Sequence, residues 1–182
     1  AALDLHRQLA GRDGASVAVG AYQAALDVCD RPRPDDPYSA KFSLQHTVAI
    51  ALAEGKVVQA SFDADARARV SGERDKVSVG LSPTVNAAYP KAWGVEVSVK
   101  AADGTELKAV RRDAKGDPEN PVSASQITEK ARLQMIDAGI DPDRYKILIE
   151  RILDLPNNRP VRDLDLFPVP AATEKARVAR SA

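Results

Sequence analysis

The feature that most constrains the fold is a pair of strand-like segments in the second half of the chain. Val95, Val97 and Val99 alternate with polar residues, which is the pattern of a strand with one buried face. Asp103-Gly104 comes next, a pair typical of a tight β-turn, and another strand-like segment follows it. The pattern predicts an antiparallel β-hairpin.

Other segments add strands and helices to this hairpin. One strand is expected within residues 16–29; its alternation fails near Ala24-Ala25, so its end stays open. Another strand is expected over residues 76–81. Helices are expected over residues 38–55, 62–75, 123–139 and 141–153. We therefore expect an α+β fold of two layers, in which a mostly antiparallel sheet of three or four strands packs with about four helices.

Capping residues support the limits of these helices. Ser39 is the expected N-cap of the helix over residues 38–55, and Gly55 follows its end. Ser123 and Gln126 have the spacing of a capping box, and the helix that they begin ends at Gly139.

The length of 182 residues is sufficient for one domain with a sizeable core. We expect that domain over residues 1–156, with residues 1–14 as a junction segment. Residues 157–182 are proline-rich at first and then lose helical periodicity, so we expect an extended and partly disordered tail there.

Charge and composition exclude several classes of function. The 26 basic and 26 acidic side chains balance, which argues against nucleic-acid or anionic-membrane partners. The most apolar run, residues 48–53, is far shorter than the ~20 residues of a membrane span. Cys29 is the only cysteine, so an intrachain disulfide and a cysteine metal cluster are excluded. Without a signal-peptide pattern at the start, we expect a cytoplasmic protein.

One helix carries polar residues that a core helix does not need. Lys41, Gln45 and His46 lie close together in the segment 38–55, near the end where the helix dipole favours an anion. If the segment is one continuous helix, Lys41 and Gln45 share a face. The group is either one wall of an anion pocket or a solvated lysine beside a hydrogen-bonded boundary histidine.

Familiar catalytic and metal-binding spacings are absent from the sequence. There is no nucleophile elbow, phosphate-binding loop, dinucleotide fingerprint or zinc-protease helix. The stretch 115–123, with one Gly and two prolines, is either a rigid connector or a loop that closes over a site. His6, His46 and Cys29 are the only nitrogen and sulfur ligands, so we expect no zinc site, whereas a carboxylate-only Mg²⁺ or Ca²⁺ site stays open.

Three motifs resemble the MmgE/PrpD family, which includes 2-methylcitrate dehydratase, cis-aconitate decarboxylase and iminodisuccinate epimerase. The motifs are the A-K-F-S-L-x-[YH]-x-V-A helix from Ala40 to Gly55, the W-x-x-x-V-x-V hairpin from Trp93 to Gly104, and the K-G-D-P-E-N-P loop and helix from Lys115 to Ala131. Members of this family have a large helical domain and a smaller α+β lid, and the chain resembles the lid.

The resemblance implies a function in which the lid closes over an active site built mainly by the helical domain. The implied reaction is that of a lyase or isomerase on small polycarboxylates, without metal or organic cofactor. A base removes a proton α to a carboxylate, and cations and donors stabilise the developing charge. His46 stands at a catalytic position where tyrosine is common, and Lys41, Ser43 and Gln45 are the implied substrate-binding residues.

Three functions stay open at this point. In the first, the chain is such a lid and is inactive without the helical domain. In the second, it is a stand-alone binding module or subunit that docks on a separate helical partner chain, and in the third it is an unrelated small enzyme that only mimics the motifs. For His46, the resemblance leaves open whether the side chain transfers a proton or only forms a hydrogen bond.

Overall fold

The computed structural model describes residues 1–157 and 160–161, and the chain divides into two compact units, Ala1–Pro121 and Val122–Ala182. The domain limit expected at residue 156 and the junction segment 1–14 stay predictions. The expected tail, residues 157–182, lies outside the described residues apart from residues 157, 160 and 161.

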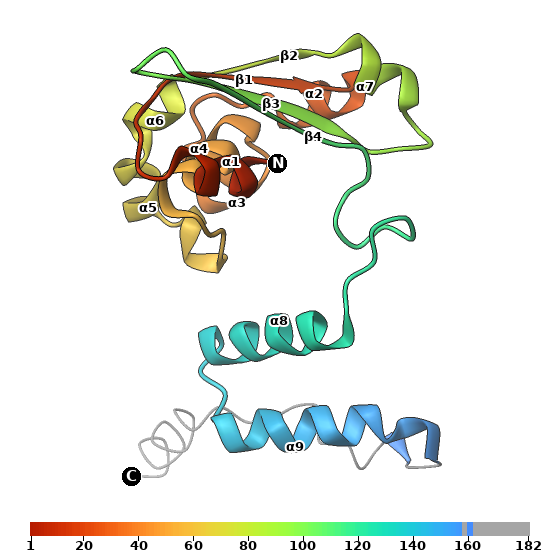
Figure 1. Cartoon of the computed structure of the whole chain (residues 1–182). Helices are drawn as coiled ribbons and strands as arrows, with labels where there is room; N and C mark the ends of the chain where they lie inside the picture. Colours follow the sequence, from red (N-terminus) through yellow and green to blue (C-terminus); the bar gives the residue numbers. More distant parts are fainter. Residues whose placement is uncertain (158–159, 162–182) are drawn as a thin grey trace. The chain divides into compact units, whose positions relative to one another are not determined.

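The first unit contains a four-stranded sheet with the strand order β2-β1-β3-β4 (Figure 1). Its strands are β1 Gly14–Ala21, β2 Val77–Leu81, β3 Val95–Ala101 and β4 Glu106–Arg111. β3 pairs antiparallel with β1 and with β4, whereas β1 pairs parallel with β2. The predicted hairpin is β3–β4, and the predicted α+β fold with a mostly antiparallel sheet is confirmed.

The helices of the first unit lie on one face and near one end of this sheet (Figure 1). They are α1 Ala2–Leu9, α2 Gln23–Cys29, α3 Pro37–Lys41, α4 Leu44–Glu54, α5 Ala64–Arg69, α6 Ser71–Asp75 and α7 Pro83–Ala88, with a 3-10 turn at Gln59–Phe62. Figure 1 shows α1 and α4 against one face of the sheet, with α2 and α7 near one end of it. α2 occupies the segment where the predicted strand alternation fades.

The core lies between the sheet and the pair α1 and α4. The sheet presents alternate valines to it, because every second side chain of a strand points to the same face. Val17, Val97 and Val99 come from β1 and β3, and Leu5 and Ile50 come from α1 and α4; all five are nearly or completely buried. Each such side chain contributes about 1.5–3 kcal/mol by leaving water.

The helix expected over residues 38–55 is two helices. Asp36 caps α3, with Pro37 in its first turn, and Ser43 caps α4. The prediction that Ser39 is the N-cap is wrong, because Asp36 is the N-cap and Ser39 is the N3 residue of the same capping box. Gly55 is confirmed as the position after the helix, with φ of 66° in the left-handed region that favours glycine. The helix expected over residues 62–75 is likewise divided, into α5 and α6.

The second unit contains α8 Ala124–Asp137, α9 Pro142–Leu153 and a 3-10 turn at Leu155–Asn157. The capping box of Ser123 and Gln126 is confirmed, and Asp141 caps α9 as expected. α8 and α9 contain no buried residue. Across the described stretches of both units, no helix has the length and apolar character needed to cross a membrane.

Candidate functional site

Three of the four residues predicted from the sequence meet at the start of α4. Ser43, Gln45 and His46 have relative exposures of 1%, 4% and 0%, so they are as buried as the apolar core. Lys41, at the end of α3, is exposed. The break between α3 and α4 corrects the expectation that Lys41 and Gln45 share one continuous helix face, because the helix ends at Lys41 and restarts after Ser43.

Ser43 joins the helix to the proline-rich connector that precedes α3. Its Oγ accepts a hydrogen bond from the backbone N–H of His46 at 3.0 Å, which caps the helix. The same hydroxyl donates to the backbone carbonyl of Arg31 at 2.6 Å. Ser43 therefore holds the connector and the first turn of α4 in a fixed relation.

Gln45 makes a second link to the connector. Its Nε2 donates to the Asp30 carboxylate, and because a carboxylate only accepts, the identity of the amide nitrogen is fixed. The amide oxygen Oε1 is buried and has no hydrogen-bond partner in the described part of the chain. The side chain therefore carries one satisfied donor group and one unsatisfied acceptor.

His46 has the same imbalance. Its Nε2 lies 2.8 Å from the backbone carbonyl oxygen of Ser61, so this nitrogen carries the hydrogen. Its Nδ1 is buried without a partner. The pKa of His46 lies below the ordinary histidine value, chiefly because burial disfavours the charged form, with Arg74 and Arg67 adding to this effect. At neutral pH the ring is uncharged, and Nδ1 presents a lone pair.

Lys41 remains available at the surface. Its Nζ lies 6.0 Å from the centroid of the Phe62 ring, within the range of a cation–π contact. Phe62 also packs against the His46 ring, with centroids 5.8 Å apart. One aromatic ring thus contacts both the exposed cation and the buried imidazole.

The arrangement brings together a buried base and a nearby exposed cation. Two unsatisfied acceptors on adjacent residues suit a ligand that donates hydrogen bonds, and a neutral imidazole suits proton abstraction. In the described part of the chain, no three side chains of the His, Cys, Asp and Glu types gather as metal ligands would.

Sequence reasoning missed Asp30 and Ser61, which contact Gln45 and His46. Ser61 contributes through its backbone carbonyl, a group that every residue has. Asp30 lies 15 residues before Gln45, in a connector without periodicity. No sequence pattern links either residue to α4.

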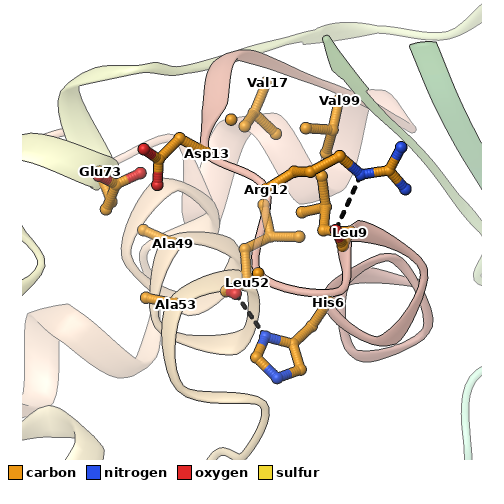
Figure 2. A pocket seen from close by; sticks show the side chains of 12 residues that line it. His6, Leu9, Arg12, Asp13, Val17, Ala49, Leu52, Ala53, Glu73 and Val99 are labelled. Carbon is orange, nitrogen blue, oxygen red and sulfur yellow. Dashed lines mark hydrogen bonds between the residues drawn. The ribbon is translucent and has the colours of Figure 1, made fainter. Parts of the chain in front are cut away.

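A separate cavity of about 280 Å³ lies beside α1, α4 and the start of β1 (Figure 2). Its polar lining residues are His6, Arg12, Asp13 and Glu73. Figure 2 shows His6 bonded to the carbonyl of Leu52 and Arg12 bonded to that of Leu9, at 2.6 and 2.9 Å. These bonds hold the wall together, and none of the four predicted site residues lines this cavity.

The stretch 115–123 begins as a loop fastened by its own hydrogen bonds. The Asp117 carboxylate accepts from the N–H of Ala114 at 3.0 Å, and the Gly116 N–H donates to the carbonyl of Asn120 at 2.8 Å. Gly116 has φ of 107°, which favours glycine. These contacts fix the loop locally, and both interpretations of the stretch, as a rigid connector or as a loop that closes over a site, stay predictions.

Comparison with protein families matches most of the chain to one family model. The model of the MmgE/PrpD C-terminal domain matches residues 1–155, which is most of the chain. A search of curated proteins found no match. The matched range contains all four predicted site residues and the motifs that resemble this family. The chain belongs to the MmgE/PrpD family, and residues 1–155 are its C-terminal domain.

Proposed function

We propose that this chain is the lid of an MmgE/PrpD-type enzyme that acts on small polycarboxylates, as a lyase similar to 2-methylcitrate dehydratase. The lid closes over an active site built mainly by a helical domain, and the reaction uses no metal and no organic cofactor. The family match supports the assignment to a C-terminal domain. The observation that carries the proposal is the pair of unsatisfied buried acceptors, Gln45 Oε1 and His46 Nδ1.

These acceptors are costly for a domain that needs only to fold. A buried polar atom without a hydrogen bond costs about 1–3 kcal/mol. An apolar side chain of similar size at either position would avoid that cost. Retention of two such atoms in adjacent residues supports a role in binding or catalysis rather than in stability alone.

Each site residue has a distinct role in the proposal. His46 accepts a hydrogen bond or a proton from the substrate through Nδ1, because its Nε2 is committed to Ser61. Lys41 attracts a carboxylate group. Ser43 and Gln45 orient the first turn of α4 against the connector and line the site.

The competing interpretation is that His46 only fastens the turn Gln59–Phe62 to α4. Its complete burial and its bond to Ser61 suit that structural role. For catalysis, this turn or its neighbours must move when a substrate arrives, since the imidazole has no exposed surface.

The test is activity of the native polypeptide that contains this chain, measured with a panel of small polycarboxylates. His46→Gln keeps an N–H that can reach Ser61 and removes the Nδ1 lone pair. We expect it to lower kcat by about 10²–10⁴-fold with an unchanged urea midpoint. A kcat within twofold of the wild type would leave His46 with the structural role alone.

A stand-alone module that docks on a separate helical chain is the second candidate function. The observation that favours docking is the set of exposed apolar side chains on α8 and α9. They are Ile127, Leu133, Ile136, Ile147, Ile152 and Leu153. The intact mass of the native protein distinguishes the candidates: a mass well above 19.5 kDa supports a lid within a longer enzyme, and a mass near 19.5 kDa supports the stand-alone module.

A further inference from the structure

We propose that Arg31 is a second substrate-binding cation, which together with Lys41 forms a subsite for two carboxylate groups. This inference rests on the proposed function, because it assigns a further residue to the same site. Arg31 lies in the proline-rich connector, outside the family motifs described above.

The predicted site residues themselves fix the position of Arg31. Ser43 donates to the backbone carbonyl of Arg31 at 2.6 Å, and Gln45 donates to the side chain of the preceding residue, Asp30. Both donors are buried at the start of α4. The connector is therefore held at the first turn of this helix by two hydrogen bonds from residues that the site already contains.

Aromatic rings hold both cations in similar surroundings. The guanidinium carbon of Arg31 lies 6.0 Å from the centroid of the Phe42 ring, and the ammonium of Lys41 lies 6.0 Å from that of Phe62. Phe42 is the residue after Lys41, so the ring that Arg31 contacts belongs to the neighbour of the second cation in the chain. Such contacts restrict a long cationic side chain while its N–H groups still reach solvent.

Neither cation is neutralised by a carboxylate. Among residues 1–157 and 160–161, no ion pair forms at Arg31 or at Lys41. The Arg31 Nε donates to the carbonyl of Val28 at 3.1 Å. The two terminal nitrogens of the guanidinium have no hydrogen-bond partner among the residues that the structure describes. Both residues are exposed.

Nearby acidic groups are engaged elsewhere. Asp30 accepts from Gln45, Asp36 accepts from the first backbone N–H groups of α3, and Asp63 accepts from the N–H of Ala66. Asp35 accepts from the hydroxyl of Ser39 at 3.5 Å. These carboxylates keep their charge, but within the described residues none of them forms an ion pair with Arg31 or Lys41, so both cations can pair with an external anion.

The chemistry of the two cations suits a polycarboxylate. The guanidinium binds a carboxylate through two parallel N–H···O bonds, whereas the ammonium acts as a mobile point charge. A ligand with two carboxylates contacts both cations at once, and a monocarboxylate contacts only one. The subsite therefore favours dicarboxylates and tricarboxylates over monocarboxylates.

The test compares two arginines of the same connector in the native polypeptide. Arg31→Gln removes the proposed contact, and Arg33→Gln, at an exposed residue of the same connector to which we assign no role in the site, is the matched control. With the polycarboxylate that the wild type turns over, we expect Arg31→Gln to raise KM about 10-fold or more with little change in kcat. Arg31→Lys should recover part of the loss, and Arg33→Gln should leave KM unchanged.

Each outcome separates the inference from the function on which it rests. An active wild type whose KM is unchanged by Arg31→Gln would overturn the Arg31 assignment and leave the proposed function standing. An equal rise in KM for both variants would reduce the effect to general surface charge and would also overturn it. A wild type that turns over no member of the polycarboxylate panel would contradict the proposed function itself.

Discussion

The first turn and the middle of α4 are buried to a similar extent and are built from opposite kinds of side chain. Toward the middle of the helix, Ala49 and Ile50 pack into the core with 1% and 0% exposure. In the first turn, Gln45 and His46 are equally hidden, yet each leaves a polar atom without a partner. Burial of the apolar middle stabilises the fold, whereas burial of polar atoms without partners in the first turn lowers its stability.

This difference separates the part of the helix that folds the domain from the part that we assign to the substrate. A side chain retained at a cost in stability is a candidate for function, and a side chain that only stabilises is not. Substitutions in the middle of α4 should therefore lower stability, and substitutions in its first turn should lower activity with less effect on stability.

The largest effect on stability is expected in the apolar middle of α4. Ile50→Ala removes a fully buried side chain and leaves a cavity, so the free energy of unfolding should fall by about 2–5 kcal/mol. Urea unfolding followed by fluorescence of Trp93, the only tryptophan, measures this change in the first unit. Val28→Ala, at a residue of α2 in the same unit that is 48% exposed, should cost less than about 1 kcal/mol. Equal losses would contradict the core as described.

An intermediate effect is expected at Ser43, which caps α4 and binds the connector. Ser43→Ala removes a helix cap and a buried hydrogen bond to Arg31, so unfolding should become easier by about 1–3 kcal/mol. Ser123→Ala removes the cap of α8 at an exposed position and should cost about 0.5–1 kcal/mol. Helix content by circular dichroism during urea unfolding checks both variants. An exposed cap that costs as much as the buried one would mean that Ser43 is only a local cap.

A smaller effect is expected from pH. The folded pKa of His46 is lowered, so the unfolded chain binds this proton more readily than the folded one. The stability contributed by the neutral ring is therefore complete above the ordinary histidine pKa of about 6.5 and is lost as the pH falls below it. Urea midpoints between pH 8 and 5.5 should decline in the wild type. In His46→Gln the decline over this range should be weaker, and an identical decline would assign it to other groups.

The smallest effect on stability is expected at Gln45. Gln45→Met keeps the volume and helix propensity, removes the unsatisfied oxygen and leaves the exposed Asp30 to water. We expect the urea midpoint to stay within about 1 kcal/mol of the wild type or to rise, while activity of the native polypeptide falls. A loss of stability comparable to that of Ile50→Ala would show that Gln45 is a structural residue.

The sequence predicted the parts of the fold that depend on local patterns. Valine alternation and Asp103-Gly104 identified the hairpin, and Ser123 and Asp141 identified the starts of α8 and α9. The parallel pairing of β1 with β2 was not predicted, because pairing between distant strands depends on packing that no local pattern records.

The sequence contains two signals that indicate the division of the segment 38–55 into α3 and α4. Asp36-Pro37 is a strong start for a helix, and Ser43 is a second N-cap only seven residues later. The four residues of the candidate site come from the sequence and stay a prediction, and their geometry was not predicted. Burial of Ser43, Gln45 and His46 depends on the connector and on the turn Gln59–Phe62, which fold over them from other parts of the chain.

The most direct test of the central claim is ¹⁵N NMR of histidine in the native polypeptide during titration with the polycarboxylate that it turns over. The His46 signals are assigned with the His46→Gln variant. We expect the free protein to carry the proton on Nε2 and the lone pair on Nδ1, and we expect the Nδ1 signal to move as the ligand saturates. A proton on Nδ1 in the free protein, or His46 signals that stay fixed at saturating ligand, would contradict the account.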